Sequence, residues 1–524
     1  MTTTAHDLRT LVHERLGDAQ VVVVSNREPY IHSHAGDEIV CQVPAGGLVT
    51  ALDPVMRACG GTWVAHGAGD ADREVVDRRD RVLVPPQDGA PARDQYRLKR
   101  VWLSKAEEEG YYYGFANQAL WPLCHQAFVR PRFEAADWET YRAVNRRFAE
   151  AVLDELEPGP ALLLIQDYHF ALIPRMLKEA RPETFGARSG LAIAQFWHIP
   201  WPTRDAFGIC PWAEELLDGL LGTDLLGFHT QQHCASFLYT VDRTLESVVD
   251  YEHATVQRQG RQTLVRPYPI SVDVAEISGA AMDPSVTVEA ERLRHQLGLR
   301  GQLVGIGIDR LDYTKGIPDR FRAIDRLLEA HPEYQGRFTF LQLGPVSRIH
   351  IPEYQALNDD LYHLMVAINR KHGDGAWQPI RLLKANHPRS ALLAFFRLAD
   401  LCVVSSLHDG MNLVAKEFVA ARPDGETALV LSRYTGAARE LVDAIQINPY
   451  DVDGFAEGLR TALELPAEEK RWRMARMRAV VEENTVYDWA SRMLTDLARV
   501  ADQAPATSRS REALLEGSGD FVVT

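Results

Sequence analysis

The chain has 524 residues, more than one hydrophobic core usually organises, so we expect at least two domains. Hydrophobic residues make up 46% and charged residues 25%, which is typical of a globular protein and too apolar for a disordered one. The formal net charge of -15 argues against binding of nucleic acid or of an acidic membrane, because both need a basic face. Anionic small molecules stay compatible with this charge, since a local group of Arg and Lys can bind them.

The six cysteines are scattered, without a Cys-x-x-Cys pair or a His spacing typical of zinc, so we predict buried, reduced thiols. The first twenty residues lack the basic and apolar regions of a secretory signal. No stretch reaches about 18 consecutive apolar residues, so no membrane span is predicted. We therefore expect a cytoplasmic protein and leave open whether it forms a homo-oligomer.

Apolar runs alternate with amphipathic stretches along the first half of the chain. A short polar helix is expected over residues 1–18. Residues 21–24, 161–165 and 191–196 are apolar and end in polar segments, which is typical of buried parallel strands. Residues 138–156 have helical periodicity. Strand, polar loop, helix and strand in this order predict a doubly wound α/β sheet.

The same pattern begins again near residue 268. Residues 303–308, 338–343, 401–404 and 428–431 are expected strands, and a closing helix is expected over 486–501. The sequence therefore predicts two Rossmann-like domains. Ligands of open α/β sheets bind beyond the carboxyl ends of the strands, so two such domains facing each other would share one interdomain cleft.

The loop after the strand at 303–308 carries Arg310, Asp312 and Lys315. An Arg and a Lys five residues apart beyond a buried strand can converge on a diphosphate, the Arg as a planar fork and the Lys as a point charge. The alternative is a pair of solvated surface charges, and these residues alone leave it open.

Residues 407–417 contain the end of a strand, a Gly turn and a helix that starts near Asn412. The backbone N–H groups at a helix start are unpaired and suit a phosphate. Glu417 is placed to accept both hydroxyls of a ribose. Asp409 is placed to hold sugar hydroxyls, unless it merely caps the helix.

In the first half, Arg27, Tyr112 and Trp121, together with Arg348 from the second half, are candidates for another anion pocket. Asp167 and His198 follow adjacent strands and could bind sugar hydroxyls or assist proton transfer. Tyr112 and Trp121 are also compatible with a core position, and His198 with a satisfied strand-end histidine.

Residues 451–454 have the Asp-x-Asp-Gly pattern of a phosphatase nucleophile loop. Too few residues follow for that domain, so we expect this segment to start a helix.

Many ordered segments resemble the trehalose-6-phosphate synthase family, the retaining GT-B glycosyltransferases of family 20. The resemblance covers about residues 20–500. Its motifs are Ser25-Asn26-Arg27, Ala45-Gly46-Gly47-Leu48, Tyr111-Tyr112 with Leu120-Trp121-Pro122, Asp167-Tyr168-His169, His198-Ile199-Pro200, 224–228, Arg310-Leu311-Asp312-Tyr313 with Lys315-Gly316, and 409–417.

The resemblance implies a role for each candidate. Catalysis would fall to Arg310 and Lys315, which stabilise the departing diphosphate, with His198 and Asp167. Donor binding would use Gly46, Gly47, Asp409, Gly410, Met411, Asn412, Leu413, Val414 and Glu417. Acceptor binding would use Arg27, Tyr112, Trp121, Asp167 and Arg348. No metal and no cofactor is implied, because a UDP-, GDP- or ADP-glucose is a substrate.

The resemblance also implies a division of labour between domains. Residues 1–267 would bind the acceptor and 268–485 the nucleotide-sugar. Residues 486–505 would form a helix that packs back on the N-terminal domain, and 506–524 a flexible tail.

Five features depart from the family pattern. The loop from Arg27 to Ala45 is long and carries Glu28-Pro29-Tyr30, His66 stands where a Trp is usual, and Gln166 replaces a His. His408 replaces an Arg, and 382–389, expected to face the base, also differs.

The leading hypothesis is synthesis of α,α-trehalose 6-phosphate with retention. The alternatives are a glucosylglycerol-phosphate synthase that uses glycerol 3-phosphate, a pseudo-glycosyltransferase and a catalytically silent relative that senses sugar phosphates. A pyridoxal-phosphate-dependent phosphorylase shares the two-domain plan, but no Lys lies in a recognisable Schiff-base context.

Overall fold

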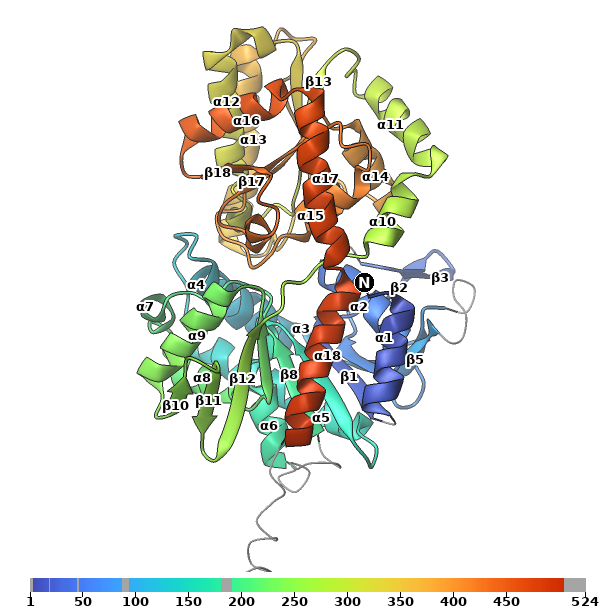
Figure 1. Ribbon diagram of the computed structural model, residues 1–524, viewed down its shortest axis with the longest axis vertical. Coiled ribbons are helices and arrows are strands. Elements are labelled where there is room, and N and C mark those ends of the chain that lie inside the picture. The colour runs from blue at the N-terminus through green and yellow to red at the C-terminus, as the bar shows by residue number, and fades with distance from the viewer. Residues whose placement is uncertain (1–2, 18, 45–46, 87–93, 181–190, 504–524) are drawn as a thin grey trace, which may run out of the picture.

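Two twisted β-sheets organise the chain, one in each of two lobes that lie one above the other in Figure 1. The computed structural model describes residues 3–17, 19–44, 47–86, 94–180 and 191–503. The two-lobed α/β architecture predicted from the sequence is confirmed.

The sheet of the N-terminal lobe has its strands in the order β10 (Val248–Asp250), β11 (Thr255–Arg258), β12 (Arg261–Pro267), β9 (Leu225–Phe228), β8 (Leu191–Phe196), β7 (Ala161–Gln166), β1 (Gln20–Arg27), β4 (Thr62–His66), β6 (Tyr96–Val101) and β5 (Arg81–Val84). The strands from β12 to β6 run parallel, and antiparallel strands close both edges. Val22, Val23 and Val24 of β1 are fully buried, as expected for a strand covered on both faces.

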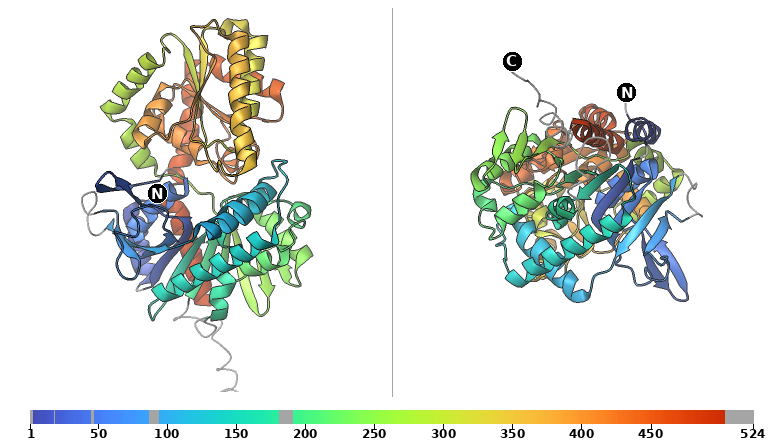
Figure 2. Two further views of the ribbon diagram at one scale, coloured as in Figure 1. Left: turned by 180° about the vertical axis from the view of Figure 1, so that it is seen from behind. Right: turned by 90° about the horizontal axis from the view of Figure 1, so that it is seen from below.

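The helices of this lobe cover both faces of the sheet (Figure 2). They are α1 (Ala5–Leu11), α2 (Gly47–Cys59), α3 (Lys105–Glu108), α4 (Trp121–His125), α5 (Ala135–Glu155), α6 (Ile173–Ala180), α7 (Arg204–Phe207), α8 (Ala213–Leu220) and α9 (Gln231–Thr244). A separate hairpin of β2 (Ile31–Ala35) and β3 (Glu38–Gln42) projects from the lobe. The segment Glu109–Leu120 is a π-helix that joins α3 to α4.

The C-terminal sheet is entirely parallel, in the order β15 (Ile380–Leu383), β14 (Phe338–Leu343), β13 (Leu303–Ile308), β16 (Leu401–Val404), β17 (Ala428–Ser432) and β18 (Ile445–Ile447). Its helices are α10 (Val274–Ala281), α11 (Pro284–Gln296), α12 (Ile317–Ala330), α13 (Pro352–His372), α14 (Arg389–Leu398), α15 (Leu413–Ala421), α16 (Val452–Glu464) and α17 (Ala467–Glu483). Asp451 caps α16 by accepting a hydrogen bond from Gly454 N, so the segment at 451–454 starts a helix as predicted.

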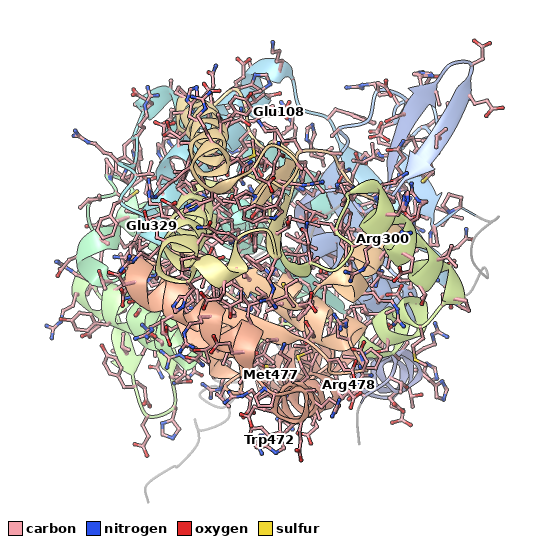
Figure 3. The ribbon with its side chains drawn as sticks, turned by 90° about the horizontal axis from the view of Figure 1, so that it is seen from above. Glu108, Arg300, Glu329, Trp472, Met477 and Arg478 are labelled. Atoms are coloured by element: carbon pink, nitrogen blue, oxygen red, sulfur yellow. The ribbon has the colours of Figure 1, made fainter. Side chains whose placement is uncertain are left out.

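The last helix connects the two lobes. α17 lies on the outside of the C-terminal lobe, where Figure 3 shows Trp472 and Arg478, and Trp472 is half exposed while Met477 is buried. α17 ends at Glu483. After Thr485 the chain forms α18 (Val486–Gln503), which runs down the N-terminal lobe (Figure 1). There Trp489 packs edge-on against Phe196 of β8, and Tyr268 donates a hydrogen bond to Asp496.

The strand orders fix where a ligand can bind. In the C-terminal sheet the chain reverses its direction of strand addition between β13 and β16, and in the N-terminal sheet between β1 and β7. Ligands of such sheets bind beyond the strand ends at this switch point. Arg27 is the last residue of β1, and the segments that follow β7, β13 and β16 carry Asp167, Arg310 and Asp409.

All six cysteines are free thiols. Cys124, Cys210, Cys234 and Cys402 are buried as predicted, whereas Cys41 and Cys59 are partly exposed. In the part of the chain that the structure describes, no helix is long and apolar enough to cross a membrane.

Candidate active site

One large cleft of about 1290 Å³ lies between the lobes. Single ligand sites usually occupy about 300–1,000 Å³, so this cleft has room for two substrates. It is lined by fifteen of the residues predicted from the sequence: Arg27, Gly47, Tyr112, Trp121, Asp167, His198, Arg310, Lys315, Arg348, Asp409, Met411, Asn412, Leu413, Val414 and Glu417. Gly46 lies outside the described residues.

Gly410 does not line the cleft, unlike the other predicted donor residues in the described ranges. A Cβ at this position would lie 2.0 Å from the carbonyl oxygen of His198 in the other lobe. Gly410 therefore allows the two backbones to approach each other closely. The donor contact expected for Gly410 stays a prediction.

Arg320 joins the loop that follows β13 to the loop that follows β16. Its buried guanidinium donates to Asp309 at 2.8 Å, to Gln342 at 2.6 Å and to Ser405 at 3.0 Å. Leu407 N also donates to Thr314 O at 2.8 Å, which ties the loop after β16 to the loop after β13. A buried, fully bonded ion pair of this kind fixes geometry, since removal of one partner would leave an uncompensated charge.

Lys315 and Asp409 form a close ion pair in the cleft, with Nζ and Oδ2 2.5 Å apart. Burial lowers the pKa of Lys315, but the carboxylates of Asp409 and Asp309 more than offset this, so the pKa lies above its ordinary value. Burial raises the pKa of Asp409, and the Lys315 charge outweighs it, so the pKa is lowered. Both groups are therefore charged at neutral pH, and Asp409 does not cap α15.

The cap of α15 is Asn412, whose Oδ1 accepts from Ala415 N at 3.1 Å. Its backbone has a φ of 90°, a strained conformation for a residue other than Gly. Leu413 and Val414 supply N–H groups of the first turn, which lack intrahelical partners and carry partial positive charge. Such strain is often found at functional sites.

Glu417 lies on the second turn of α15 and also lines the cleft. Burial raises the pKa of its carboxyl, which Arg389 partly offsets. Arg389 in turn pairs with Glu276 of α10 at 2.5 Å. These three residues all line the cleft.

Arg348, together with Arg310 of the donor side, faces two aromatic rings in the cleft. The Arg348 guanidinium lies 4.5 Å above the Trp121 ring and 5.8 Å from the Tyr112 ring, and Arg310 lies 6.0 Å from Trp121. Trp121 Nε1 and Arg348 Nε are buried without a hydrogen-bond partner in the described part of the chain. Burial raises the pKa of Tyr112, but the charges of Arg348, Arg27 and Arg310 lower it to about 7.

Asp167 and His198 follow adjacent strands and lie side by side. Asp167 accepts a hydrogen bond from His198 N at 3.1 Å and has a φ of 71°, again a strained value. Burial raises the pKa of Asp167 to about 7. His198 Nε2 lies 2.8 Å from Gln166 Oε1, and burial lowers the pKa of His198 to about 3, so its imidazole is neutral.

The positions that depart from the family pattern divide into two groups. Gln166 and Tyr30 line the cleft. Glu28 points away from it into a buried network, where it accepts from Arg100 at 2.8 Å. His66 and His408 lie outside the cleft lining, and His408 packs on Tyr434.

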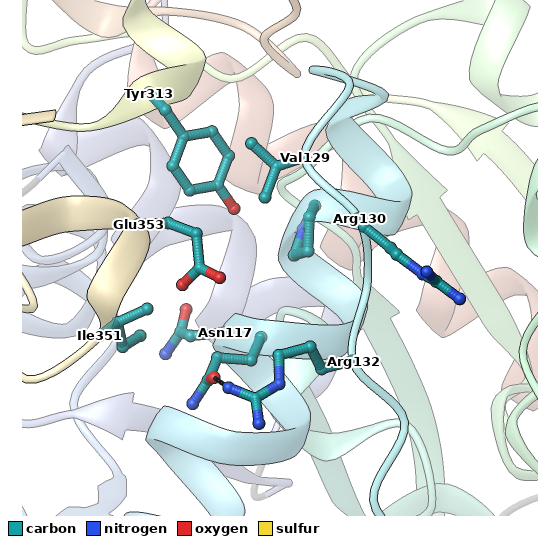
Figure 4. A pocket seen from close by; sticks show the side chains of 9 residues that line it. Asn117, Val129, Arg130, Arg132, Tyr313, Ile351 and Glu353 are labelled. Atoms are coloured by element: carbon teal, nitrogen blue, oxygen red, sulfur yellow. Dashed lines mark hydrogen bonds between the residues drawn. The ribbon is translucent and has the colours of Figure 1, made fainter. Parts of the chain in front are cut away.

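A much smaller pocket of about 10 Å³ lies beside the cleft. Figure 4 shows Glu353 of α13 pointing toward Asn117, with Arg132 nearby and Tyr313 above. A space of this size holds at most a water molecule, so we interpret it as a contact between the lobes.

Sequence reasoning gave no role to several residues of the cleft, among them His125, His169 and Glu276, whereas Arg389 belongs to 382–389, which was expected to face the base. His125 could have been found, because it lies four residues after Trp121 on the same helix face. Glu276 and Arg389 are 113 residues apart, and no local pattern joins them. Among the described residues, no group of three or more His, Cys, Asp or Glu side chains is arranged to hold a metal ion.

Residues 19–499 match the sequence model of glycosyltransferase family 20. The chain belongs to this family. A trehalose-6-phosphate synthase from Mycolicibacterium smegmatis is 36% identical to it, over 97% of this chain and 99% of the relative. The resemblance seen in the sequence is therefore confirmed. As a member of family 20, this chain is a glycosyltransferase.

Solved structures agree with this assignment. An E. coli protein bound with UDP-2-fluoro glucose has a TM-score of 0.80 and 30% identity, over 92% of this chain and 99% of that one. A UDP-forming α,α-trehalose-phosphate synthase from Burkholderia xenovorans, in complex with glucose 6-phosphate, has a TM-score of 0.79 and 30% identity, over 91% and 100%. The GT-B fold expected for family 20 is confirmed.

Proposed function

We propose that this chain transfers glucose from a nucleotide-diphosphate glucose to glucose 6-phosphate, with retention, and so makes α,α-trehalose 6-phosphate. One observation supports the proposal most strongly. Lys315, Arg310 and the start of α15 line the same cleft as Arg27, Tyr112, Trp121 and Arg348. Two separate anion sites that open into one space suit a donor diphosphate and an acceptor phosphate.

The donor would bind to the C-terminal lobe. The N–H groups of Leu413 and Val414 would hydrogen-bond the diphosphate, and Glu417 would accept the ribose hydroxyls. Asp409, already oriented by Lys315, would hold hydroxyls of the glucose. UDP-glucose is the donor that we propose, because related proteins are UDP-forming or were solved with a UDP-sugar.

The acceptor phosphate would bind among Arg27, Arg348, Tyr112 and Trp121. The unpartnered Trp121 Nε1 and Arg348 Nε are N–H donors, and phosphate oxygens are the acceptors that such a site lacks. Asp167 would contact the acceptor hydroxyls. Its backbone strain would hold the carboxylate toward the cleft.

The chemical step would proceed on one face of the sugar. The bond from the glucose C1 to the diphosphate oxygen breaks while the acceptor hydroxyl oxygen attacks C1 from the same side. The hydroxyl proton passes to the departing phosphate oxygen, and Arg310 and Lys315 stabilise the charge that develops there. Preorganised charges of this kind supply a large share of catalysis in a site that excludes water.

Incubation of the purified protein with UDP-glucose and each acceptor tests the proposal. We expect release of UDP and a new α,α-linked product with glucose 6-phosphate. Turnover with glycerol 3-phosphate but not with glucose 6-phosphate would contradict the acceptor assignment. Binding of UDP-glucose without turnover on either acceptor would favour a silent relative. The same assay with ADP- and GDP-glucose ranks the donor bases.

A further inference from the structure

His125 is a buried histidine of the cleft to which the proposed mechanism gives no role. It ends α4, its side chain is 1% exposed, and it lines the cleft. Its ring centroid lies 4.1 Å from that of Trp121. Asp409, Lys315 and Asp312 of the C-terminal lobe act on it electrostatically.

The hydrogen bond of His125 fixes its tautomer. Nδ1 lies 2.9 Å from the carbonyl oxygen of Trp121, which can only accept, so Nδ1 carries the proton. Burial lowers the pKa of His125 to about 4, and the ring is neutral. Nε2 therefore keeps its lone pair, and the hydrogen bond described for this ring is that of Nδ1.

The chemistry of this atom selects its ligand. An unprotonated imidazole nitrogen repels phosphate oxygens but accepts a hydrogen bond from a hydroxyl. His125 packs on Trp121 of the acceptor side, and the cleft residues that act on it electrostatically include Asp409 and Lys315 of the donor side, where the hydroxyls belong to the transferred sugar. We infer that His125 Nε2 accepts a hydrogen bond from a hydroxyl of the donor hexose, so that the N-terminal lobe also recognises the donor. This inference rests on the proposed function.

Three substitutions separate hydrogen bonding from packing. His125→Gln places an amide oxygen near the position of Nε2. His125→Asn keeps a donor near Nδ1 but places nothing at Nε2, and His125→Phe keeps a ring against Trp121. We expect His125→Gln to stay close to wild type, and His125→Asn and His125→Phe to lose about 10-fold in donor kcat/KM, as for one hydrogen bond. The reverse order, or a wild-type value for His125→Phe, would overturn the inference.

Deoxy-sugar donors give an independent readout. The donor kcat/KM is measured with UDP-glucose analogues that each lack one hydroxyl. One analogue should lower the kcat/KM of wild type about 10-fold relative to UDP-glucose, whereas it should not lower the kcat/KM of His125→Phe any further. Equal losses in both proteins for every analogue would contradict the contact.

Equilibrium binding keeps the test separate from the proposed function. His125→Phe should bind UDP-glucose more weakly and UDP, which lacks the hexose, as wild type does. Unchanged UDP binding also serves as the folding control. If wild type showed no transfer, the proposed function would fail, while the binding comparison would still decide the role of His125.

Discussion

The donor wall and the acceptor wall of the cleft hold their charges differently. On the donor wall, Lys315 lies 2.5 Å from Asp409, so its charge already has a partner. On the acceptor wall, Arg348 lies over the Trp121 ring. Its Nη1 pairs with Asp312 at 3.4 Å and donates to Tyr354 at 2.6 Å, while its Nε has no partner among the described residues. The Lys315 charge is thus balanced by Asp409 until charge develops on the leaving group, whereas the acceptor wall keeps an N–H donor of Arg348 that a phosphate oxygen can accept from. The difference suits a leaving group on one wall and a phosphate monoester on the other.

Removal of a cation from the donor wall should have the largest effect, because it stabilises charge that appears in the transition state. We expect Lys315→Ala to lower kcat at least ~100-fold, and Arg310→Ala to do the same. Steady-state kinetics measure the kcat of both variants. Lys371→Ala, a change in a surface ion-pair network, is the matched control and should leave kcat unchanged. Near-normal rates in both site variants would mean that the donor wall is misassigned.

Removal of a cation from the acceptor wall should act on binding instead. Arg348→Ala is expected to raise the KM for glucose 6-phosphate about 10- to 100-fold, the range for hydrogen bonds to charged groups. Kinetics with unphosphorylated glucose supply the control, because a residue that binds only the phosphate should not alter kcat/KM for glucose. Equal losses on both acceptors would show that Arg348 does not discriminate the phosphate.

Loss of the Glu417 carboxylate should weaken the donor alone. Glu417→Gln is expected to raise the KM for UDP-glucose about 10-fold, with the KM for glucose 6-phosphate unchanged. Glu426→Gln, an exposed residue of the same lobe, is the control. An unchanged KM for UDP-glucose in Glu417→Gln would show that Glu417 does not bind the ribose.

A pH effect of about two- to threefold is expected on the acceptor wall. The pKa of Tyr112 is lowered to about 7, so the phenolate fraction grows as the pH rises through 7. A phenolate neutralises part of the arginine charge and competes with phosphate, and the KM for glucose 6-phosphate should therefore rise above pH 7. Tyr112→Phe should flatten this profile. If Tyr112→Phe shows the same pH dependence of this KM as wild type, Tyr112 is not its source.

Strands and strand ends could be predicted from the sequence because a buried parallel strand needs an unbroken apolar run. The expected ranges 303–308, 338–343 and 401–404 match β13, β14 and β16 residue for residue. Asn412 at the start of α15 was also expected. The candidate residues gather in one cleft because the switch points of both sheets bring their loops together.

Contacts between distant segments could not be predicted. Tyr112 reaches the cleft from a π-helix, which has no recognisable periodicity. The Arg320 cluster joins three strand ends, and Glu28 turns toward Arg100 rather than the cleft. The close approach of Gly410 to His198 is a further contact that the sequence does not show, and the donor contact expected for Gly410 stays a prediction. Each of these depends on tertiary packing that a local pattern does not record.

A crystal structure with UDP and glucose 6-phosphate bound together tests the central claim most directly. The account predicts diphosphate oxygens within hydrogen-bond distance of Lys315 Nζ and the Arg310 guanidinium, and the acceptor phosphate between Arg27 and Arg348. A diphosphate bound away from Lys315, or an acceptor phosphate outside the aromatic wall, would contradict it.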